Sequence, residues 1–197
     1  MNNSKHRQII VTAKKLFWQF GVRRVSIEEI CTEANVSKMT FYKHFRNKLE
    51  LAKFILKKMT DEGIANYQEI MAKDISFREK VRQTIELKLE QTNDLSQAFF
   101  ADIHNNKIPE LKAYFDELVQ FSIKIILDDY TAAQKRGEIR KNVKPEFIMY
   151  FLNQLFVMTE DENLQKLYKQ PQALIMELTN FFFYGILERD CKVEIQS

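Results

Sequence analysis

A shortage of chain breakers is the feature that most limits what this 197-residue chain can fold into. The chain contains only 4 Gly and 3 Pro, the residues that most often mark tight turns and the ends of strands. Hydrophobic residues make up 45% of it and charged residues 29%, a balance typical of a globular protein with a buried core. We therefore expect an all-α fold.

Apolar spacing and a capping signal predict the first two helices. Apolar residues recur every three or four positions between about residues 5 and 20, which is the spacing of an amphipathic helix, and Gly21 ends it. Ser26 and Glu29 then form an S-x-x-E capping box, in which each side chain satisfies a free backbone N–H at the start of a helix. We expect a short second helix over about residues 27–34.

A sharp turn and two more caps follow. Asn35 stands where the chain must turn, and Asn tolerates the left-handed conformation that such a turn needs. Ser37 can cap a third short helix, and Asn47 with Glu50 repeats the capping pattern for a fourth. Two short helices joined by a turn and packed under a longer helix have the outline of a helix-turn-helix DNA reader.

Longer helical patterns occupy the rest of the chain. The sequence predicts helices from Ser76 to about Gln91, Leu95 to His104, Pro109 to the stretch KRGEIR, Pro145 to Met158, and Pro171 to near Arg189. The acidic stretch EDEN after Met158 and Thr159 is expected to be a solvated loop or a helix end. The stretches FFFYGIL and FIMYFLNQLFVM are apolar on more than one side, which a monomer of this size cannot easily hide.

The charge is divided unevenly along the chain. Residues 1–58 hold 13 Lys and Arg against 4 Asp and Glu, a net charge of +9, whereas the remainder holds 17 against 23, a net charge of −6. A basic first part favours a polyanionic partner, and an acidic second part opposes coating of nucleic acid by the whole protein.

The sequence also predicts where the protein works. The first residues, MNNSKHRQ, lack the apolar core of a signal peptide. The longest nearly apolar run is shorter than the roughly 20 residues that span a bilayer. Cys31 and Cys191 are far apart and have no CxxC partner. We expect a reduced, cytoplasmic location with no membrane contact.

The stretch VSIEEICTEANVSKMTFYKHFRNKLEL resembles the DNA-binding signature of the tetracycline-repressor (TetR) family, T-x-x-x-I-A-x-x-A-G-V-S-x-x-x-(L/F)-Y-x-(H/Y)-F-x-x-K-x-x-L. The matching positions are Ile30, Ala34, Val36, Ser37, Phe41, Tyr42, His44, Phe45, Lys48 and Leu51. The sequence departs from the pattern at three positions, because Asn35 replaces the usual Gly, Cys31 replaces Ala, and Met39 stands where a small residue is common.

The resemblance implies a role for each matching polar position. Lys38, Met39 and Thr40 would face base edges, and Met39 would suit a thymine methyl group. The residues implied to grip phosphate are Ser37, Tyr42, Lys43, His44 and Lys48, and Ser26 caps the helix that points toward the DNA backbone.

The resemblance also implies a domain plan and a function. Residues 1–60 would form the helix-turn-helix DNA-binding domain, and residues 61–197 a helical domain for effector binding and for dimerisation through the last two helices. The protein would be a homodimeric, ligand-responsive regulator, most often a repressor, on a palindromic double-stranded DNA operator. The aromatic residues Phe99, Phe100, Phe121, Tyr150 and Phe151 would suit a small apolar or aromatic effector.

Two other classes of protein remain to be weighed. An architectural or partner-controlled DNA binder without a small effector would share the same DNA-binding domain. An all-helical enzyme has little support, since no nucleophile–base pairing, metal-ligand spacing or phosphate loop appears. His104, with Asp102 nearby, lacks the further ligands of a metal site, so we expect it to be structural and expect neither a metal nor a cofactor.

Overall fold

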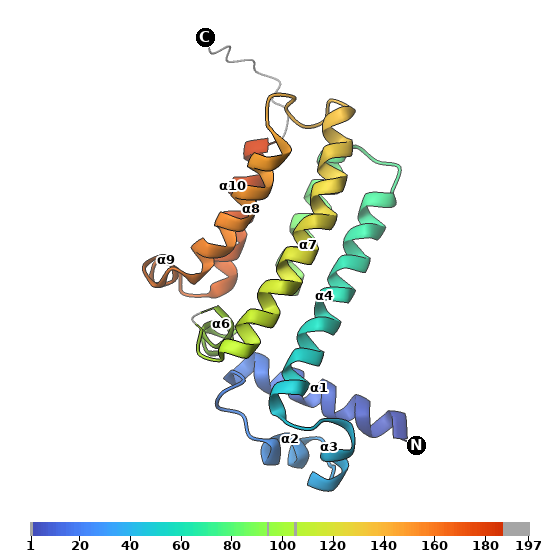
Figure 1. Cartoon of the computed structure of the whole chain (residues 1–197), viewed down its shortest axis with the longest axis vertical. Helices are drawn as coiled ribbons and strands as arrows, with labels where there is room; N and C mark the ends of the chain where they lie inside the picture. The colour runs from blue at the N-terminus through green and yellow to red at the C-terminus, as the bar shows by residue number, and fades with distance from the viewer. Residues whose placement is uncertain (1, 94, 105, 187–197) are drawn as a thin grey trace.

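The computed structural model describes residues 2–93, 95–104 and 106–186, and every regular element in those ranges is a helix (Figure 1). These helices are α1 (Asn2–Phe20), α2 (Ile27–Glu33), α3 (Lys38–His44), α4 (Lys48–Ala72), α5 (Phe77–Gln91), α6 (Gln97–His104), α7 (Pro109–Lys135), α8 (Pro145–Glu160), α9 (Glu162–Leu167) and α10 (Pro171–Ile186). The all-α expectation is confirmed. Arg189 and Cys191 lie outside the described residues.

The predicted capping residues start their helices as expected. Glu29 N donates to Ser26 Oγ over 3.1 Å and Ser26 N donates to Glu29 Oε2 over 2.7 Å, which completes the capping box of α2. Asn47 Oδ1 and Ser76 Oγ likewise accept hydrogen bonds at the starts of α4 and α5. Four unpaired N–H groups begin every helix, so these caps decide where each helix can start.

Two features of the helices were not given by the sequence. The fourth helix, α4, continues to Ala72, so it crosses the expected domain boundary between residues 60 and 61. The stretch EDEN holds the end of α8, which confirms the helix-end alternative, and it also holds the N-cap of the short helix α9, which was not expected. Asp161 Oδ1 accepts from the backbone N–H of Asn163 over 2.7 Å and of Leu164 over 3.2 Å.

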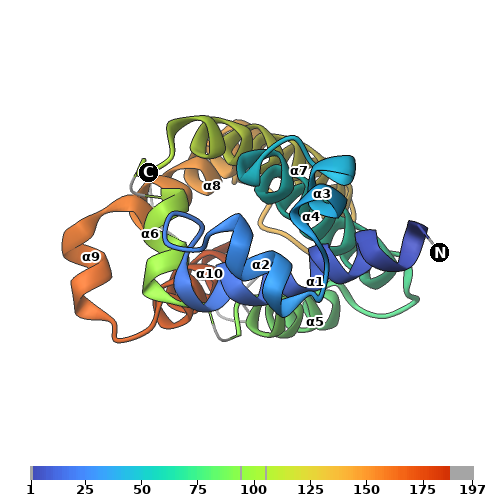
Figure 2. The same ribbon diagram turned by 90° about the horizontal axis from the view of Figure 1, so that it is seen from below.

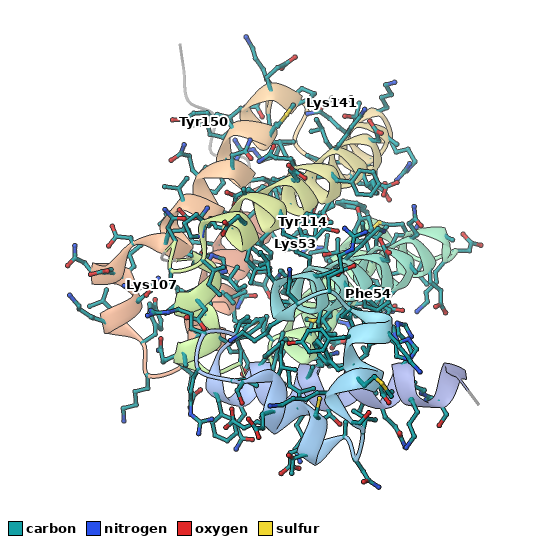
Figure 3. All side chains as sticks on the ribbon, turned by 60° about the horizontal axis from the view of Figure 1, so that its bottom comes forward. Lys53, Phe54, Lys107, Tyr114, Lys141 and Tyr150 are labelled. Carbon is teal, nitrogen blue, oxygen red and sulfur yellow. The ribbon has the colours of Figure 1, made fainter. Side chains whose placement is uncertain are left out.

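The molecule has a head and a body. We call residues 2–56 the head and the remaining described residues the body. In Figure 1 the head helices lie at one end, α4 and α7 run side by side away from them, and α8 and α10 pack on the other side of α7. Near the head, Lys53 of α4 lies over the ring of Tyr114 of α7, 5.4 Å from its centroid (Figure 3). No helix within the described ranges is both long enough and apolar enough to cross a membrane.

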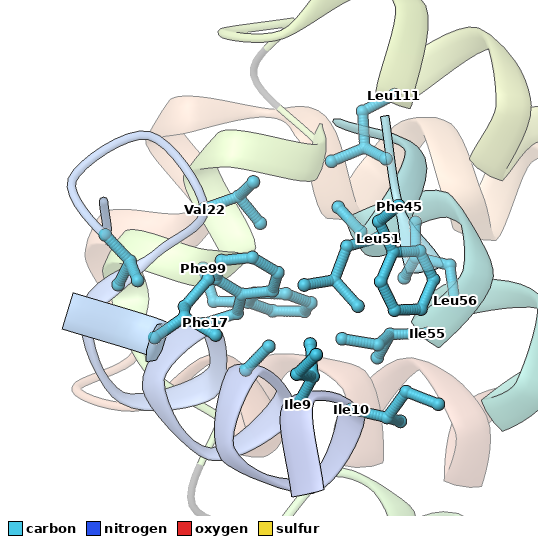
Figure 4. Packing of buried hydrophobic residues seen from close by; sticks show 14 of the residues in the cluster. Ile9, Ile10, Phe17, Val22, Phe45, Leu51, Ile55, Leu56, Phe99 and Leu111 are labelled. Atoms are coloured by element: carbon cyan, nitrogen blue, oxygen red, sulfur yellow. The ribbon is translucent and has the colours of Figure 1, made fainter. Parts of the chain in front are cut away.

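Two apolar clusters form the core. The first joins the head to α6 and to the start of α7, with Phe17, Leu51, Phe99 and Leu111 among its members (Figure 4). The second lies in the body and includes Phe77, Val81, Tyr130, Ile139 and Phe182. Because α6 contributes to the first cluster, the head is packed directly onto the body rather than hanging from α4 alone.

Candidate nucleic-acid interface

The turn between α2 and α3 has the geometry that Asn35 suggests. Asn35 adopts a φ of 49°, in the left-handed region. The backbone N–H of Val36 donates to the carbonyl of Cys31 over 2.9 Å, and Lys5 Nζ donates to the carbonyl of Asn35 over 3.3 Å. The turn is therefore closed by hydrogen bonds from both the following residue and α1.

Two aromatic anchors fix the rotation of α3. Phe41 is fully buried and Phe45 is 4% exposed, and both belong to the first apolar cluster. With this side held against the head core, the opposite side of α3 must face outward. Met39 is 69% exposed and Tyr42 is 56% exposed. The view from below in Figure 2 places α2 and α3 at the surface of the head.

The start of α3 is shaped by its own hydroxyl groups. Ser37 Oγ accepts from the backbone N–H of Thr40 over 3.1 Å and lies 3.0 Å from Thr40 Oγ1. Ser37 is exposed and Thr40 is half-buried. Like Ser26 on α2, Ser37 therefore defines the N-terminus of its helix while remaining at the surface.

Two exposed lysines supply positive charge on this surface. Lys38 Nζ lies 3.1 Å from Glu28 Oε2, but both side chains are more than half exposed, and such pairs contribute little stability. Lys43 is exposed and forms no ion pair within the described ranges. Both ammonium groups can turn toward a phosphate at low energetic cost.

His44 and Lys48 are placed differently from the other expected contacts. The His44 ring packs 5.2 Å from the His6 ring, and its Nε2 is buried without a hydrogen-bond partner in the described structure. Lys48 Nζ donates to the carbonyls of Arg23 over 3.0 Å and Val25 over 2.6 Å. Burial lowers the pKa of Lys48. The geometry does not present either group as a free phosphate contact.

A contact between α6 and the loop after α1 was missed by the sequence reasoning. Asp102 Oδ2 accepts from the backbone N–H of Arg23 over 2.8 Å. Gly21 has a φ of +84°, and a Cβ there would lie 2.7 Å from Asp102 Oδ2 and 3.2 Å from the Ala98 backbone. In the sequence, Gly21 indicated only the end of a helix, because no local pattern links this loop to Asp102, which lies 79 positions after Arg23.

The expected effector residues do not gather around one cavity. Phe99 and Phe100 are buried in the first cluster, and Phe151 packs against the second. Phe121 is 56% exposed and Tyr150 is 61% exposed, and Tyr150 projects from α8 (Figure 3). Helical spacing identifies aromatic residues on a face, but it cannot tell core packing from a cavity wall.

Two surface hollows lie elsewhere on the described structure. One, of about 340 Å³, lies between α6 and α9 and is lined by Gln97, Glu162, Gln165, Lys166 and Tyr168. The other, of about 410 Å³, lies beside the loop after α1 and is lined by Phe20, Arg23, Arg24, Ala98, Ala101, Asp102 and Lys107. None of the five aromatic residues lines either hollow. Within the described ranges, no group of three or more His, Cys, Asp or Glu could hold a metal ion.

Comparison with known proteins identifies the head. The sequence model of the family "Bacterial regulatory proteins, tetR family" matches residues 9–54. The transcriptional regulator YhgD of Bacillus subtilis is 27% identical over 162 residues, 80% of this chain and 83% of YhgD. The transcriptional activator FasR of Mycolicibacterium smegmatis is 24% identical over 108 residues, 55% of this chain but only 49% of FasR.

A solved structure shares the whole fold. The regulator FadR from Bacillus subtilis, solved with stearoyl-CoA, superposes with a TM-score of 0.68 at 17% identity, over 91% of this chain and 98% of FadR. The relatives are transcriptional regulators and not enzymes. Residues 9–54 of this chain, which hold the helix-turn-helix, are therefore similar to the tetR family of bacterial regulatory proteins, and the relatives over a longer part of the chain are regulators of transcription.

Proposed function

We propose that this protein is a homodimeric, ligand-responsive regulator of transcription, acting as a repressor, and that it binds a palindromic operator through α3. The exposed side of α3, formed by Lys38, Met39, Tyr42 and Lys43 around the buried Phe41, carries the proposal. Long polar and basic side chains on a helix that is fixed from behind suit contact with a major groove. The net charge of +9 on residues 1–58 favours the same partner.

Exposed apolar stripes on the body support a homodimer. Phe147, Tyr150 and Val157 are 57%, 61% and 56% exposed along α8, and their spacing places them on one face. On the neighbouring helix α10, Phe181 and Tyr184 are 73% and 65% exposed. Aromatic side chains that cover one another across a two-fold axis would remove this surface from water.

A contact between α6 and the loop after α1 supports a response to a small effector. Asp102 of α6 holds the backbone of Arg23, in the loop that Lys48 also holds. A ligand that binds better when α6 is shifted would therefore displace the head, and it would weaken DNA binding by the same differential affinity. FadR of Bacillus subtilis, which has a similar fold, was solved in complex with stearoyl-CoA, a ligand with a long apolar chain.

A gel-shift experiment with the DNA upstream of the protein's own gene tests the proposal. Lys43→Ala should weaken binding and reduce the salt dependence by about one counterion, and Tyr42→Ala should weaken binding on every site sequence. Lys124→Ala removes the same charge from an exposed position on α7 and should change neither property. Light scattering should give two protomers per palindrome.

Two results would contradict the DNA-binding proposal. One is a failure of the wild-type protein to bind any palindrome at low salt. The other is binding that Lys43→Ala and Tyr42→Ala leave unchanged while both variants remain folded.

A further inference from the structure

The hollow beside the loop after α1 lies where the head meets the body. Figures 1 and 2 both place this loop beside α6. From α6 the hollow is lined by Ala98 and Ala101, whose spacing of three residues places two small side chains on one face of the helix. Its volume of about 410 Å³ falls within the range of sites for small molecules, roughly 300 to 1,000 Å³. The hollow is therefore large enough for a small molecule and is shared by head and body.

The lining of this hollow is mainly basic. Arg23 and Arg24 of the head and Lys107 of the body all line it, and all three are exposed. Asp102 is the one acidic residue of the lining, and its Oδ2 already accepts the backbone N–H of Arg23 over 2.8 Å. Asp102 also interacts electrostatically with Lys48. Three positive charges against one negative charge leave the lining with a net charge of +2.

The guanidinium of Arg24 is held beside the hollow by an aromatic ring. Its central carbon lies over the ring of Phe20, 4.6 Å from the centroid, and Phe20 is itself part of the lining. The ion pair of Arg24 with Glu29 is long, at 3.6 Å, and the two side chains are 60% and 44% exposed. Glu29 Oε2 also accepts from the backbone N–H of Ser26. An exposed pair of this kind contributes little stability, so Arg24 can donate to another anion at low cost.

Arg23 and Lys107 supply the other two positive charges without any ion pair to break. Within residues 2–93, 95–104 and 106–186, neither side chain pairs with a carboxylate. Arg23 belongs to the loop whose backbone Asp102 holds, whereas Lys107 follows the end of α6 (Figure 3). An anion between them would therefore replace only water and would contact both head and body.

We propose that this hollow binds the phosphate group of a small molecule and that the bound phosphate links the head to the body. Guanidinium groups donate in a planar fork that matches phosphate oxygens, and Lys107 adds a point charge from the body. A phosphate monoester, with close to two negative charges, balances the net charge of +2 better than a single carboxylate does. Ala98 and Ala101 would contact the carbon part of the molecule. The site goes beyond the proposed function, because its occupation requires neither DNA nor a dimer.

Calorimetric titration of the full chain with inorganic pyrophosphate and inorganic phosphate, at low salt and without magnesium, tests the site. The wild-type protein should bind one pyrophosphate per protomer, and more tightly than phosphate, because three cations favour the more highly charged anion. Bound pyrophosphate should also raise the temperature of thermal unfolding.

Two variants locate the bound anion in the hollow. Lys107→Gln removes one charge and should weaken pyrophosphate binding about fivefold or more, whereas Lys107→Arg keeps the charge and should retain binding. Ala98→Leu fills the hollow without changing any charge and should weaken binding at least as much. Arg24→Gln, at an exposed position, takes its place if Ala98→Leu does not fold.

The matched controls lie on exposed positions of α7. Lys124→Gln removes a lysine charge there, and Ala113→Leu adds the same side-chain volume as Ala98→Leu. Both should bind pyrophosphate as the wild-type protein does. Circular dichroism establishes that each variant compared is folded.

Three results would overturn the proposal. The first is the absence of pyrophosphate binding, including the case in which Lys107→Gln weakens only DNA binding, which would assign these cations to the DNA backbone. The second is binding that no folded variant of the hollow weakens. The third is binding that Lys43→Gln abolishes and Lys107→Gln does not, which would place the anion on α3. Because the titration contains no DNA, a failure of the protein to bind any palindrome would contradict the proposed function and leave this site standing.

Discussion

The head and the body satisfy their polar groups in different ways. In the head, the half-buried Lys48 donates to two backbone carbonyls, and Ser26 and Ser37 close the first turns of their helices. In the body, Lys88 forms no ion pair among the described residues but is partly exposed to water, and aromatic side chains such as Phe181 are exposed. The head therefore pairs most of its polar groups within the chain, with His44 Nε2 as a buried exception, whereas the body leaves polar and aromatic side chains open to water.

The largest expected effect tests the internal completeness of the head. Phe41→Ala would empty the centre of the first cluster, where Phe41 is fully buried, and should lower the free energy of unfolding by about 3 to 5 kcal/mol. Urea unfolding followed by circular dichroism measures this loss. Phe181→Ala removes the same ring from the exposed stripe of α10. It should leave the helical content unchanged and lower the fraction of dimer in light scattering.

The comparison would break down if Phe41→Ala left the free energy of unfolding nearly unchanged, since α3 would then not be held by its aromatic anchors. It would also break down if Phe181→Ala unfolded the protomer at concentrations where the wild-type protein is monomeric.

A second effect comes from His104, the buried imidazole of the body. Burial, together with Lys112 and Lys88, lowers the pKa of His104 from 6.5 to about 3. In the unfolded chain His104 therefore becomes protonated near pH 6.5, whereas in the folded protein it becomes protonated only near pH 3. Stability is full above pH 6.5 and should fall on acidification by at most about 1.4 kcal/mol per pH unit, or roughly 3 kcal/mol by pH 4.5.

The His104 contribution is measured as a difference, because carboxylates also titrate in this range. His104→Phe keeps a ring against Phe100, whose centroid lies 4.2 Å from that of His104, and removes the proton site. Urea unfolding between pH 4.5 and 7 should give a shallower dependence for the variant. Equal slopes for the two proteins would mean that His104 takes up its proton while folded.

The smallest expected effect tests the contact between head and body. Gly21 and Gly137 both have a positive φ, +84° and +83°, so an Ala at either should cost about 1 to 2 kcal/mol in left-handed strain. A Cβ at Gly137 meets nothing within 4 Å, whereas one at Gly21 meets Asp102 and the Ala98 backbone. Gly21→Ala should therefore cost about 1 to 2 kcal/mol more than Gly137→Ala.

Thermal unfolding of the two Gly variants measures the difference. Gly21→Ala should also change DNA affinity, because its loop carries the carbonyls that hold Lys48. An equal loss of stability in the two variants would show that α6 moves away from an added Cβ at little energetic cost and does not pack tightly against the head.

Local signals predicted most of the helices and which side of α3 is exposed. Ser26, Ser37, Asn47 and Ser76 act within a few residues of themselves, so their sequence positions were enough to place helix starts. The continuation of α4 to Ala72 was not predicted, because its second half is held by burial of Tyr67 and Ile70 in the body. A local pattern does not contain that packing.

The candidate site was predicted unevenly for the same reason. The exposed positions of Lys38, Met39, Tyr42 and Lys43 follow from the helical spacing around Phe41. The inward turn of His44 toward His6 and the capture of two carbonyls by Lys48 depend on residues 38 and 23 to 25 positions away.

The sequence by itself determined an all-α chain and a helix-turn-helix with a basic surface. These properties depend on periodicity, caps and charge, which act over a few residues or along one helix. Only the tertiary structure decided that Asp102 holds the loop at Gly21, that Phe99 and Phe100 are core, and that Lys48 binds the carbonyls of Arg23 and Val25. Burial and long-range pairing belong to no single segment, because they arise only when distant helices pack together.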